Sequence, residues 1–230
     1  TIKVLEAARH AKVKKFVYAA SASCYGKTEK LVNENFKISL EHPYALSKYL
    51  GEQSVFHWHK VYGLPINSIR IFNAYGPRVR TTGAYGAVIG VFFKQKIENK
   101  PLTIVGNGKQ SRDFVYVTDL AQAFMAAALT NQKGKVFNVG TGKPQTVNYL
   151  ANLVGGKKIF IPDRPGEPKY SCADITKIKK KLKWKPKVEF KDGIKKMMSE
   201  IKNWNDAPLW TPKKIKKATK VWFTYLSKKK

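Results

Sequence analysis

The 230 residues are 43% hydrophobic and 12% aromatic, which is enough apolar material to bury a core and excludes a disordered or fibrous chain. Lysine supplies nearly all of the 44 basic residues, and with only 15 acidic residues the formal net charge is +29. Because the lysines are dispersed in pairs and triplets such as Lys179–Lys181, they are typical of solvated helix faces in a lysine-rich proteome. We therefore expect no nucleic-acid partner.

Cysteine usage and hydropathy indicate a reducing, aqueous compartment. The two cysteines, Cys24 and Cys172, stand far apart and form no CxxC or Cys/His pattern, so we expect neither a disulfide nor a metal site. No segment approaches the roughly 18 uninterrupted apolar residues of a membrane span, and the first residues lack a signal-peptide pattern. The sequence thus predicts a soluble, cytoplasmic protein with no membrane partner.

Helices and strands alternate in the first third of the chain. Ile2–Ala11 and Tyr44–Tyr62, which follows Pro43, have helical character, whereas Lys15–Ala20 and Pro65–Phe72 are short apolar segments of the kind that form buried parallel strands. This alternation is typical of right-handed crossover units. It predicts an α/β fold with a mostly parallel sheet.

Beyond Pro77 the pattern changes to shorter elements. We expect mixed short elements from Asn148 onward and no internal repeat, so the chain contains a second, smaller lobe whose segments interleave with the first. The remaining predicted helices are 86–98, 118–129, 174–182, 192–204 and 212–226, and the remaining predicted strands are 102–105 and 136–139.

Two short patterns carry hydroxyl, phenol and ammonium groups suited to catalysis. Ser21 and Ser23 directly follow the strand at 15–20, and open parallel sheets bind ligands at the carboxyl ends of their strands. Tyr44 and Lys48 are four residues apart on a predicted helix, so their side chains share one face. A neighbouring ammonium stabilises phenolate and makes tyrosine a usable general base. The same spacing also arises by chance in many helices, so the neighbouring residues must show whether the Tyr44–Lys48 pair has a catalytic role.

The strand-end serine together with Pro43-Tyr44-Ala45-Leu46-Ser47-Lys48 resembles the extended short-chain dehydrogenase/reductases, in particular nucleotide-sugar epimerases of the UDP-glucose and UDP-N-acetylglucosamine 4-epimerase type. Further segments extend this resemblance over residues 1 to about 200. These segments are Arg70-Ile-Phe-Asn73-Ala-Tyr-Gly76-Pro77-Arg78, Gly83-Ala-Tyr85, Gly106-Asn-Gly108, Arg112-Asp113-Phe114, Asn138-Val-Gly140-Thr-Gly142, Arg164-Pro-Gly166-Glu167 and Ala173-Asp174.

The resemblance implies a partial NAD-binding Rossmann-like parallel sheet joined to a smaller α+β substrate-binding lobe. Residues 1–78 and 113–145 would form the carboxyl-terminal part of the NAD-binding domain, residues 79–112 and 146–204 the nucleotide-sugar-binding lobe, and residues 205–230 a basic helical extension. Family members commonly pair through the helix that bears the catalytic tyrosine, so a homodimer is expected as well.

The same resemblance implies catalytic and cofactor roles. Ser21 and Ser23 hydrogen-bond the sugar hydroxyl that is oxidised, and Tyr44 removes its proton. Lys48 holds the nicotinamide ribose and favours the phenolate form of Tyr44. Ser21, Tyr44 and Lys48 therefore also contact NAD, the implied cofactor.

A UDP-sugar is the implied substrate. Arginine forks suit a diphosphate, and an asparagine amide can donate to one of its oxygens. The resemblance also implies that a small residue at the position of Ser171 admits N-acetylated sugars, which makes UDP-N-acetylglucosamine a candidate substrate. The implied substrate residues are Asn73, Arg112 and Arg164 for the diphosphate, Glu167 for the uridine ribose, Leu102 and Val105 for the uracil, and Tyr85 and Ser171 elsewhere in the site.

The residues after the first strand discriminate between reactions. Dehydratases of the family carry Thr-Asp-Glu where this chain has Ser21-Ala22-Ser23, and the missing carboxyls argue against 4,6-dehydration. We therefore expect NAD-dependent 4-epimerisation of a UDP-hexose or UDP-N-acetylhexosamine through a 4-keto intermediate. A dehydratase or decarboxylase of the same family, and a catalytically silent module that binds polyanions, are the alternatives.

The Gly-rich strand-turn-helix that receives the cofactor pyrophosphate in this family has no counterpart in the sequence. Gly140-Thr-Gly142 lacks the third glycine at the right distance, so we interpret it as a loop after a strand. Either the 230 residues are a fragment of a longer product, or another polypeptide supplies the missing half, or catalysis has been lost. We favour the fragment, and we expect it to bind NAD weakly or not at all.

Overall fold

The computed structural model describes residues 1–79, 88–164 and 167–226. Its central sheet is parallel and pairs neighbouring strands in a continuous register, with Ala20 opposite Arg70 and Arg70 opposite Asn138. In spatial order the strands are β1 (Phe16–Ser21), β2 (Ile66–Ile71) and β7 (Lys135–Val139). The predicted parallel α/β architecture is confirmed.

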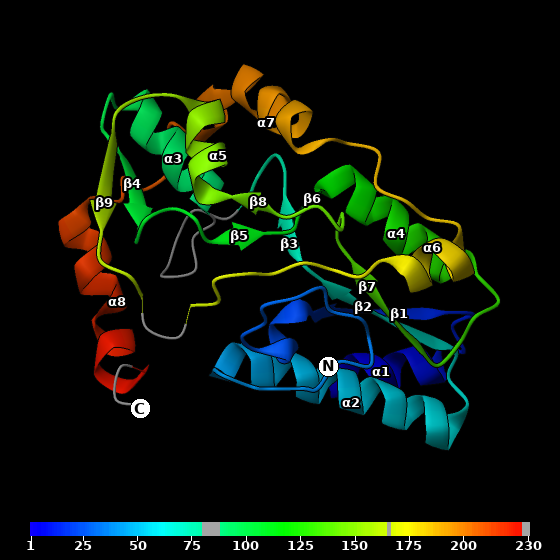
Figure 1. Ribbon diagram of the computed structural model, residues 1–230. Helices are drawn as coiled ribbons and strands as arrows, with labels where there is room; N and C mark the ends of the chain where they lie inside the picture. Colours follow the sequence, from blue (N-terminus) through cyan, green and yellow to red (C-terminus); the bar gives the residue numbers. More distant parts are fainter. Residues whose placement is uncertain (80–87, 165–166, 227–230) are drawn as a thin grey trace.

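Helices cover both faces of this sheet. Helices α1 (Ile2–His10) and α2 (Pro43–Tyr62) lie on one face, and α4 (Val117–Leu129) and α6 (Thr176–Leu182) lie on the other (Figure 1). In the described ranges, none of the helices combines the length and the apolar character that crossing a membrane requires.

The ends of α2 are set by its own sequence. Pro43 occupies the first turn, where its missing N–H costs nothing, and the His42 Nδ1 accepts a hydrogen bond from the Ala45 N–H at 3.3 Å. Gly63 ends the helix in the left-handed conformation, with φ of +68°. These signals place Tyr44 in the first turn of α2.

The central strand β2 is buried but not apolar throughout. Asn67, Ser68 and Arg70 are all buried. Each has a partner: the Asn67 Nδ2 donates to the Ala127 carbonyl oxygen at 3.0 Å, while Ser68 and Arg70 donate to the Glu52 carboxylate. Buried polar groups are tolerated when they are hydrogen-bonded in this way.

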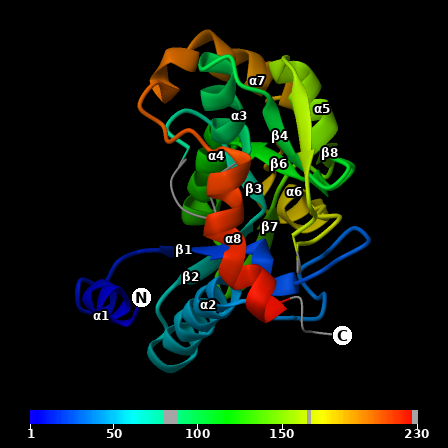
Figure 2. The ribbon, with the colours of Figure 1, turned by 90° about the vertical axis from the view of Figure 1, so that its left-hand side faces the viewer.

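A second lobe with its own core lies beside the sheet (Figures 1 and 2). Its strands β4 and β9 pair in parallel. Two short strand pairs join the lobe to the sheet region, β3 with β6 in parallel and β5 with β8 antiparallel. The bounds of these elements are β3 (Asn73–Tyr75), α3 (Val88–Ile97), β4 (Leu102–Val105), β5 (Ser111–Arg112), β6 (Phe114–Tyr116), β8 (Gln145–Thr146), α5 (Val147–Val154), β9 (Lys158–Ile161), α7 (Phe190–Ser199), the 3-10 helix η2 (Ile201–Trp204) and α8 (Pro212–Leu226).

Separate cores support the interleaved division into two lobes, which stays a proposal. The core of the lobe gathers residues of α3, β4, α5 and α7, whereas residues of β2, β7, α4 and α6 form another core under the sheet. Strand β6 contributes Phe114 and Tyr116 to the core of the lobe and Val115 to the other core. Strand β6 therefore packs into the cores of both lobes.

The prediction of one helix over 192–204 is wrong. Helix α7 ends at Ser199, and the chain tightens into η2. The Trp204 side chain at the end of η2 is buried and meets the Phe93 ring edge-on, with ring centroids 5.0 Å apart. We attribute the break between α7 and η2 to the packing of Trp204, because tertiary contacts override the weak preference of a sequence for a continuous helix.

The helix predicted over 174–182 begins two residues later than expected. The Asp174 N–H donates to the Val32 carbonyl oxygen at 2.8 Å, which keeps Asp174 extended. Its carboxylate accepts a hydrogen bond from the Thr176 N–H at 2.9 Å. Asp174 is thus held outside the first turn of α6 by a long-range contact.

Candidate active site

The two predicted serines meet where β1 ends. After Ser21 the chain turns into a short 3-10 helix, η1 (Ala22–Tyr25). The Ser21 Oγ accepts hydrogen bonds from the Ser23 N–H at 3.2 Å and from the Ser23 hydroxyl at 2.9 Å. Gly26 follows with φ of +68°, and a Cβ there would lie 2.7 Å from the Ser39 carbonyl oxygen, so this turn requires glycine. The turn therefore holds both hydroxyls at the carboxyl end of β1.

Tyr44 and Lys48 lie one helical turn apart at the beginning of α2. Tyr44 is 47% exposed, and its ring stacks on His42 with centroids 6.2 Å apart. The Lys48 Nζ donates to the Ala19 carbonyl oxygen of β1 at 3.0 Å. Because Ala19 precedes Ser21 by two residues, this bond ties the face of α2 that carries Tyr44 to the strand that carries the serines.

Tyr18 on β1 contacts Lys48, although no motif in the sequence marks this tyrosine. Its hydroxyl donates to the Lys48 carbonyl oxygen at 3.3 Å, and the Lys48 Nζ lies 5.8 Å from its ring centroid. Burial raises the pKa of Tyr18, so the hydroxyl remains a neutral donor. The Tyr18 hydroxyl also lies against Gly51 of α2. A Cβ at position 51 would lie 2.0 Å from the Tyr18 hydroxyl oxygen. The close approach of α2 to β1 therefore needs glycine at position 51.

The Gly51→Ala variant is expected to be less stable than the parent by about 1–3 kcal/mol, because the added methyl overlaps the Tyr18 hydroxyl. Helix propensity alone would stabilise the same variant by about 1 kcal/mol, so the sign of the change in unfolding free energy is informative. Urea-induced unfolding measures it. The loss should shrink in a Tyr18→Phe background, and an equal loss in both backgrounds would show that the hydroxyl is not the obstacle.

Three of the predicted substrate residues form one cluster in the second lobe. The Arg112 Nη2 pairs with the Glu167 Oε1 at 3.0 Å, and its Nη1 donates to the Ser111 carbonyl oxygen at 2.9 Å. Burial lowers the pKa of Arg112, and Glu167 acts in the opposite direction. In the described part of the chain, the Arg164 Nε and the Glu167 Oε2 are buried without a hydrogen-bond partner. Buried unpaired polar atoms are costly, so these two atoms indicate a ligand-binding position.

The other predicted substrate residues lie in different environments. Asn73 is exposed in β3, and Ser171 and Val105 are half-buried. Leu102 is only 1% exposed and packs in the core of the lobe, so its side chain offers no surface to a ligand. Tyr85 lies outside the described residues.

Asp113 holds the loop after β7 in place, a role that its position in the Arg112-Asp113-Phe114 segment does not predict. Its buried carboxylate accepts hydrogen bonds from the N–H groups of Thr141 at 2.6 Å, Gly142 at 2.9 Å and Ala173 at 2.9 Å. The loop interpretation of this segment is confirmed, because β7 ends at Val139. Asp113 joins that loop to the segment just after Ser171.

The strand end and α2 suit one half of a dinucleotide. The Ser21 hydroxyl, the exposed Tyr44 and the Lys48 ammonium are donors of the kind that a nicotinamide ribose can bind. Across the described strands, β1 has a hydrogen-bonded strand neighbour on one side only, and no Gly-rich turn for a pyrophosphate accompanies it in the sequence. No cluster of three or more metal-ligating side chains occurs within residues 1–79, 88–164 and 167–226.

A parallel sheet with serines at a strand end and a Tyr–Lys pair on the following helix defines the short-chain dehydrogenase/reductase class of enzyme domains. Within this class, the model of the NAD dependent epimerase/dehydratase family matches residues 1–140. The chain belongs to that family.

Known proteins match most of the chain. It is 38% identical over 213 residues to a putative UDP-glucose 4-epimerase of Methanocaldococcus jannaschii, a match that covers 89% of this chain and 68% of that protein. It is 33% identical over 168 residues to UDP-glucuronic acid decarboxylase 1 of Arabidopsis thaliana, covering 70% and 38%. The structure of UDP-glucuronic acid 4-epimerase from Bacillus cereus, in complex with UDP-glucuronic acid and NAD, superposes with a TM-score of 0.81 at 33% identity and covers 87% and 65%. The chain therefore spans about two thirds of the length of the epimerases that it matches.

Proposed function

We propose that the chain is the catalytic and substrate-binding part of an NAD-dependent UDP-sugar 4-epimerase. The observation that carries this proposal is the bond of the Lys48 Nζ to the β1 backbone, which sets the Tyr44 face of α2 beside the strand that ends in Ser21. The similarity to 4-epimerases supports it as well. A cytoplasmic location is part of the same proposal.

The chain's own residues would hold the sugar and move one proton. Ser21 Oγ hydrogen-bonds the C4 hydroxyl, and the Tyr44 phenolate takes its proton and later returns it. Lys48 stabilises the phenolate by its charge and holds the nicotinamide ribose. NAD, when bound, supplies the reversible oxidation at C4. Because the proton and the oxidation state are both restored, the net reaction changes only the configuration at C4.

The cluster in the second lobe would bind the nucleotide end of the substrate. Arg112 and Arg164 carry forked donors that suit a diphosphate, and the unpartnered Glu167 Oε2 can accept from a ribose hydroxyl. Ser171 is small and half-buried, which in this family favours sugars that carry an N-acetyl group, so UDP-hexoses and UDP-N-acetylhexosamines are the proposed substrates.

The decisive assay uses the product of the complete reading frame, including any in-frame sequence upstream of Thr1. Incubated with NAD and a UDP-hexose, it should form the C4 epimer, which chromatography separates and which has the mass of the substrate. A lighter product that has lost carbon dioxide would contradict the proposal and favour a decarboxylase, which the identity to a plant UDP-glucuronic acid decarboxylase keeps as the second candidate. Loss of water would indicate a dehydratase.

The Arg112→Gln variant is expected to bind UDP roughly 10- to 100-fold more weakly, because a charge-assisted hydrogen bond to the diphosphate is lost. Isothermal titration with UDP measures this change without any need for NAD or turnover. Arg9→Gln is the matched control, since Arg9 pairs with Glu6 on α1, in the sheet region. Equal UDP affinity in the parent and the Arg112→Gln variant would show that Arg112 does not bind the diphosphate.

A homodimer through α2 is proposed as the assembly. The exposed side of α2 carries large apolar residues, with Leu46, Leu50 and Val61 between 44% and 55% exposed. Apolar residues gathered on one exposed helix are typical of a contact surface.

A further inference from the structure

Helix α8 is anchored to the second lobe at its beginning. The Gln95 Nε2 of α3 donates to the Trp210 carbonyl oxygen at 2.8 Å, just before the helix starts. Ile215 and Thr219, one turn apart, are only 8% and 3% exposed. One side of the first half of α8 is therefore covered by the body of the protein, and the opposite side faces solvent.

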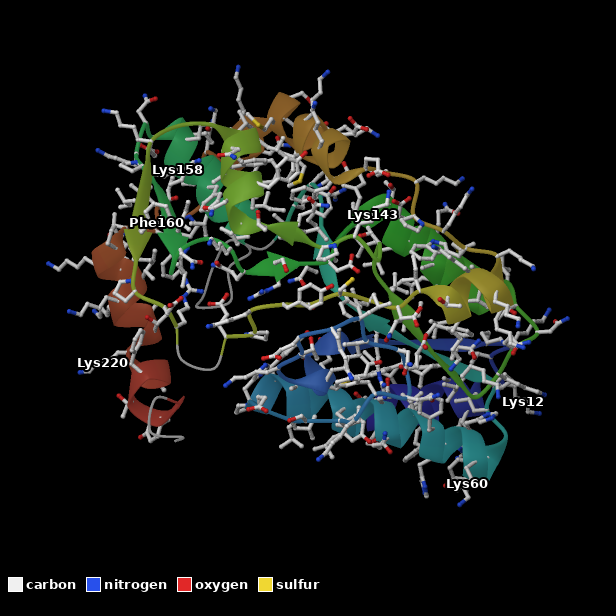
Figure 3. The ribbon with its side chains drawn as sticks, in the orientation of Figure 1. Lys12, Lys60, Lys143, Lys158, Phe160 and Lys220 are labelled. Atoms are coloured by element: carbon white, nitrogen blue, oxygen red, sulfur yellow. The ribbon has the colours of Figure 1, made fainter. Side chains whose placement is uncertain are left out.

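The solvent side of α8 is a ridge of lysines. Lys213, Lys216, Lys217 and Lys220 are all exposed, and their spacing of three, four and seven residues places them along one face, away from Ile215. Figure 3 shows Lys220 pointing outward from the helix. After Asp206 the sequence contains no acidic residue, so α8 itself supplies no carboxylate to pair with these lysines.

The end of α8 exposes large apolar side chains beside this ridge. Val221 is 62% exposed, Phe223 is 40% exposed and Tyr225 is 72% exposed. Figure 2 shows the helix running along the outside of the molecule. The positive charge of the lysines does not account for Val221 and Tyr225, because large apolar side chains gathered on an exposed surface are typical of an interaction site.

We propose that α8 docks on an anionic lipid surface, with the lysine ridge on the headgroups and the apolar last turns at the acyl boundary. Lysine-rich helices with exposed aromatic and aliphatic residues bind such surfaces through both contributions together. The helix carries no arginine, the residue best suited to reading bases and phosphates of nucleic acid, and nucleic acid offers no apolar phase for the last turns. This inference differs from the expectation of no membrane partner, which stays untested, and it goes beyond the proposed function.

Charge elsewhere on the molecule must be separated from the ridge. Lys12, Lys60 and Lys143 lie on other sides of the molecule, so weak attraction to any polyanion is general (Figure 3). The test therefore compares two quadruple variants with the same change in charge. One replaces Lys213, Lys216, Lys217 and Lys220 with glutamine, and the other replaces the exposed Lys179, Lys180, Lys181 and Lys183 of α6 and its C-terminal end.

Flotation of the full chain with vesicles of equal parts phosphatidylglycerol and phosphatidylcholine measures the binding. The α8 variant should bind roughly tenfold or more weakly than the parent, and the α6 variant should bind nearly as well as the parent. Far-UV circular dichroism checks that both fold. Equal losses in the two variants, or parent binding to pure phosphatidylcholine vesicles as strong as to the mixture, would overturn the proposal.

The apolar contribution is tested with Val221→Gln and Tyr225→Gln combined. This variant keeps every lysine, so it should lose the part of the vesicle binding that survives raised salt, since salt screens the charges and not the apolar contact. Unchanged vesicle binding in this variant, together with tighter binding of the parent to duplex DNA than to vesicles, would make α8 a nucleic-acid-binding element instead and would also overturn the proposal.

Discussion

The Tyr44→Phe variant of the complete enzyme is expected to convert a UDP-sugar to its C4 epimer roughly 10²- to 10⁴-fold more slowly, because phenylalanine cannot take up or return the C4 hydroxyl proton. The fold should not change. Tyr44 is 47% exposed, and phenylalanine keeps the ring that stacks on His42. The measurement is kcat from chromatographic separation of the two UDP-sugars.

Two controls isolate the phenol of Tyr44. Tyr62→Phe removes the hydroxyl of another exposed tyrosine at the far end of the same helix, and it should leave kcat unchanged. The UDP affinity of the Tyr44 variant should equal that of the parent, because the Arg112 and Glu167 cluster belongs to the other lobe. Activity of the Tyr44→Phe variant within threefold of the parent would remove the general base from the proposed mechanism.

Local patterns in the sequence were sufficient for the main elements of the fold. Apolar segments and turn residues located β1, β2 and β7, and Pro43 and Gly63 mark the ends of α2. The errors arise where a distant contact overrides local preference. Trp204 ends a helix early by packing on Phe93, and the bond from Asp174 to Val32 delays another.

The candidate catalytic residues belong to a recognisable motif, whereas the residues that pack against them do not. Tyr44 and Lys48 are four residues apart in a recognisable segment, and Ser21 directly follows the predicted strand that precedes it. Tyr18 looks like an ordinary strand aromatic, and only the packing of α2 on β1 brings its hydroxyl to the Lys48 backbone. Glu52 looks like a solvated helix residue, yet it is 1% exposed.

A single face of α2 runs from the surface into the interior. Tyr44, Lys48 and Glu52 are spaced by four residues, so they follow one another along this face. Tyr44 is exposed, Lys48 is half-buried, and Glu52 is buried against Arg70 of β2. The buried pair therefore anchors the same helix face that carries the proposed catalytic residues Tyr44 and Lys48.

The Glu52→Ala variant is expected to lower the free energy of unfolding by about 3–5 kcal/mol, because it leaves Arg70 as a buried charge without its partner. The Arg70 Nη2 lies 2.6 Å from the Glu52 Oε1, and the Ser68 hydroxyl donates to the other carboxylate oxygen at 2.7 Å. In the parent, burial opposes the charge of Arg70, whereas its hydrogen bond with Glu52 and the neighbouring Tyr25 raise its pKa. Arginine keeps its proton in proteins even without a carboxylate partner, so Arg70 stays charged in the variant. Urea-induced unfolding of the chain measures the loss.

Removing both charges distinguishes a lost ion pair from a general packing defect. Combining Glu52→Ala with Arg70→Met should recover part of the lost stability, since no unpaired charge then remains in the interior. Lys143→Ala breaks an ion pair of similar length whose side chains are both 69% exposed, and solvated pairs contribute roughly 0–1 kcal/mol, so its unfolding should be nearly that of the parent. If the double variant is less stable than Glu52→Ala alone, Arg70 contributes through its contacts with Tyr25 and Glu34 rather than through the carboxylate, and α2 is held to the sheet by the Lys48 and Tyr18 bonds instead.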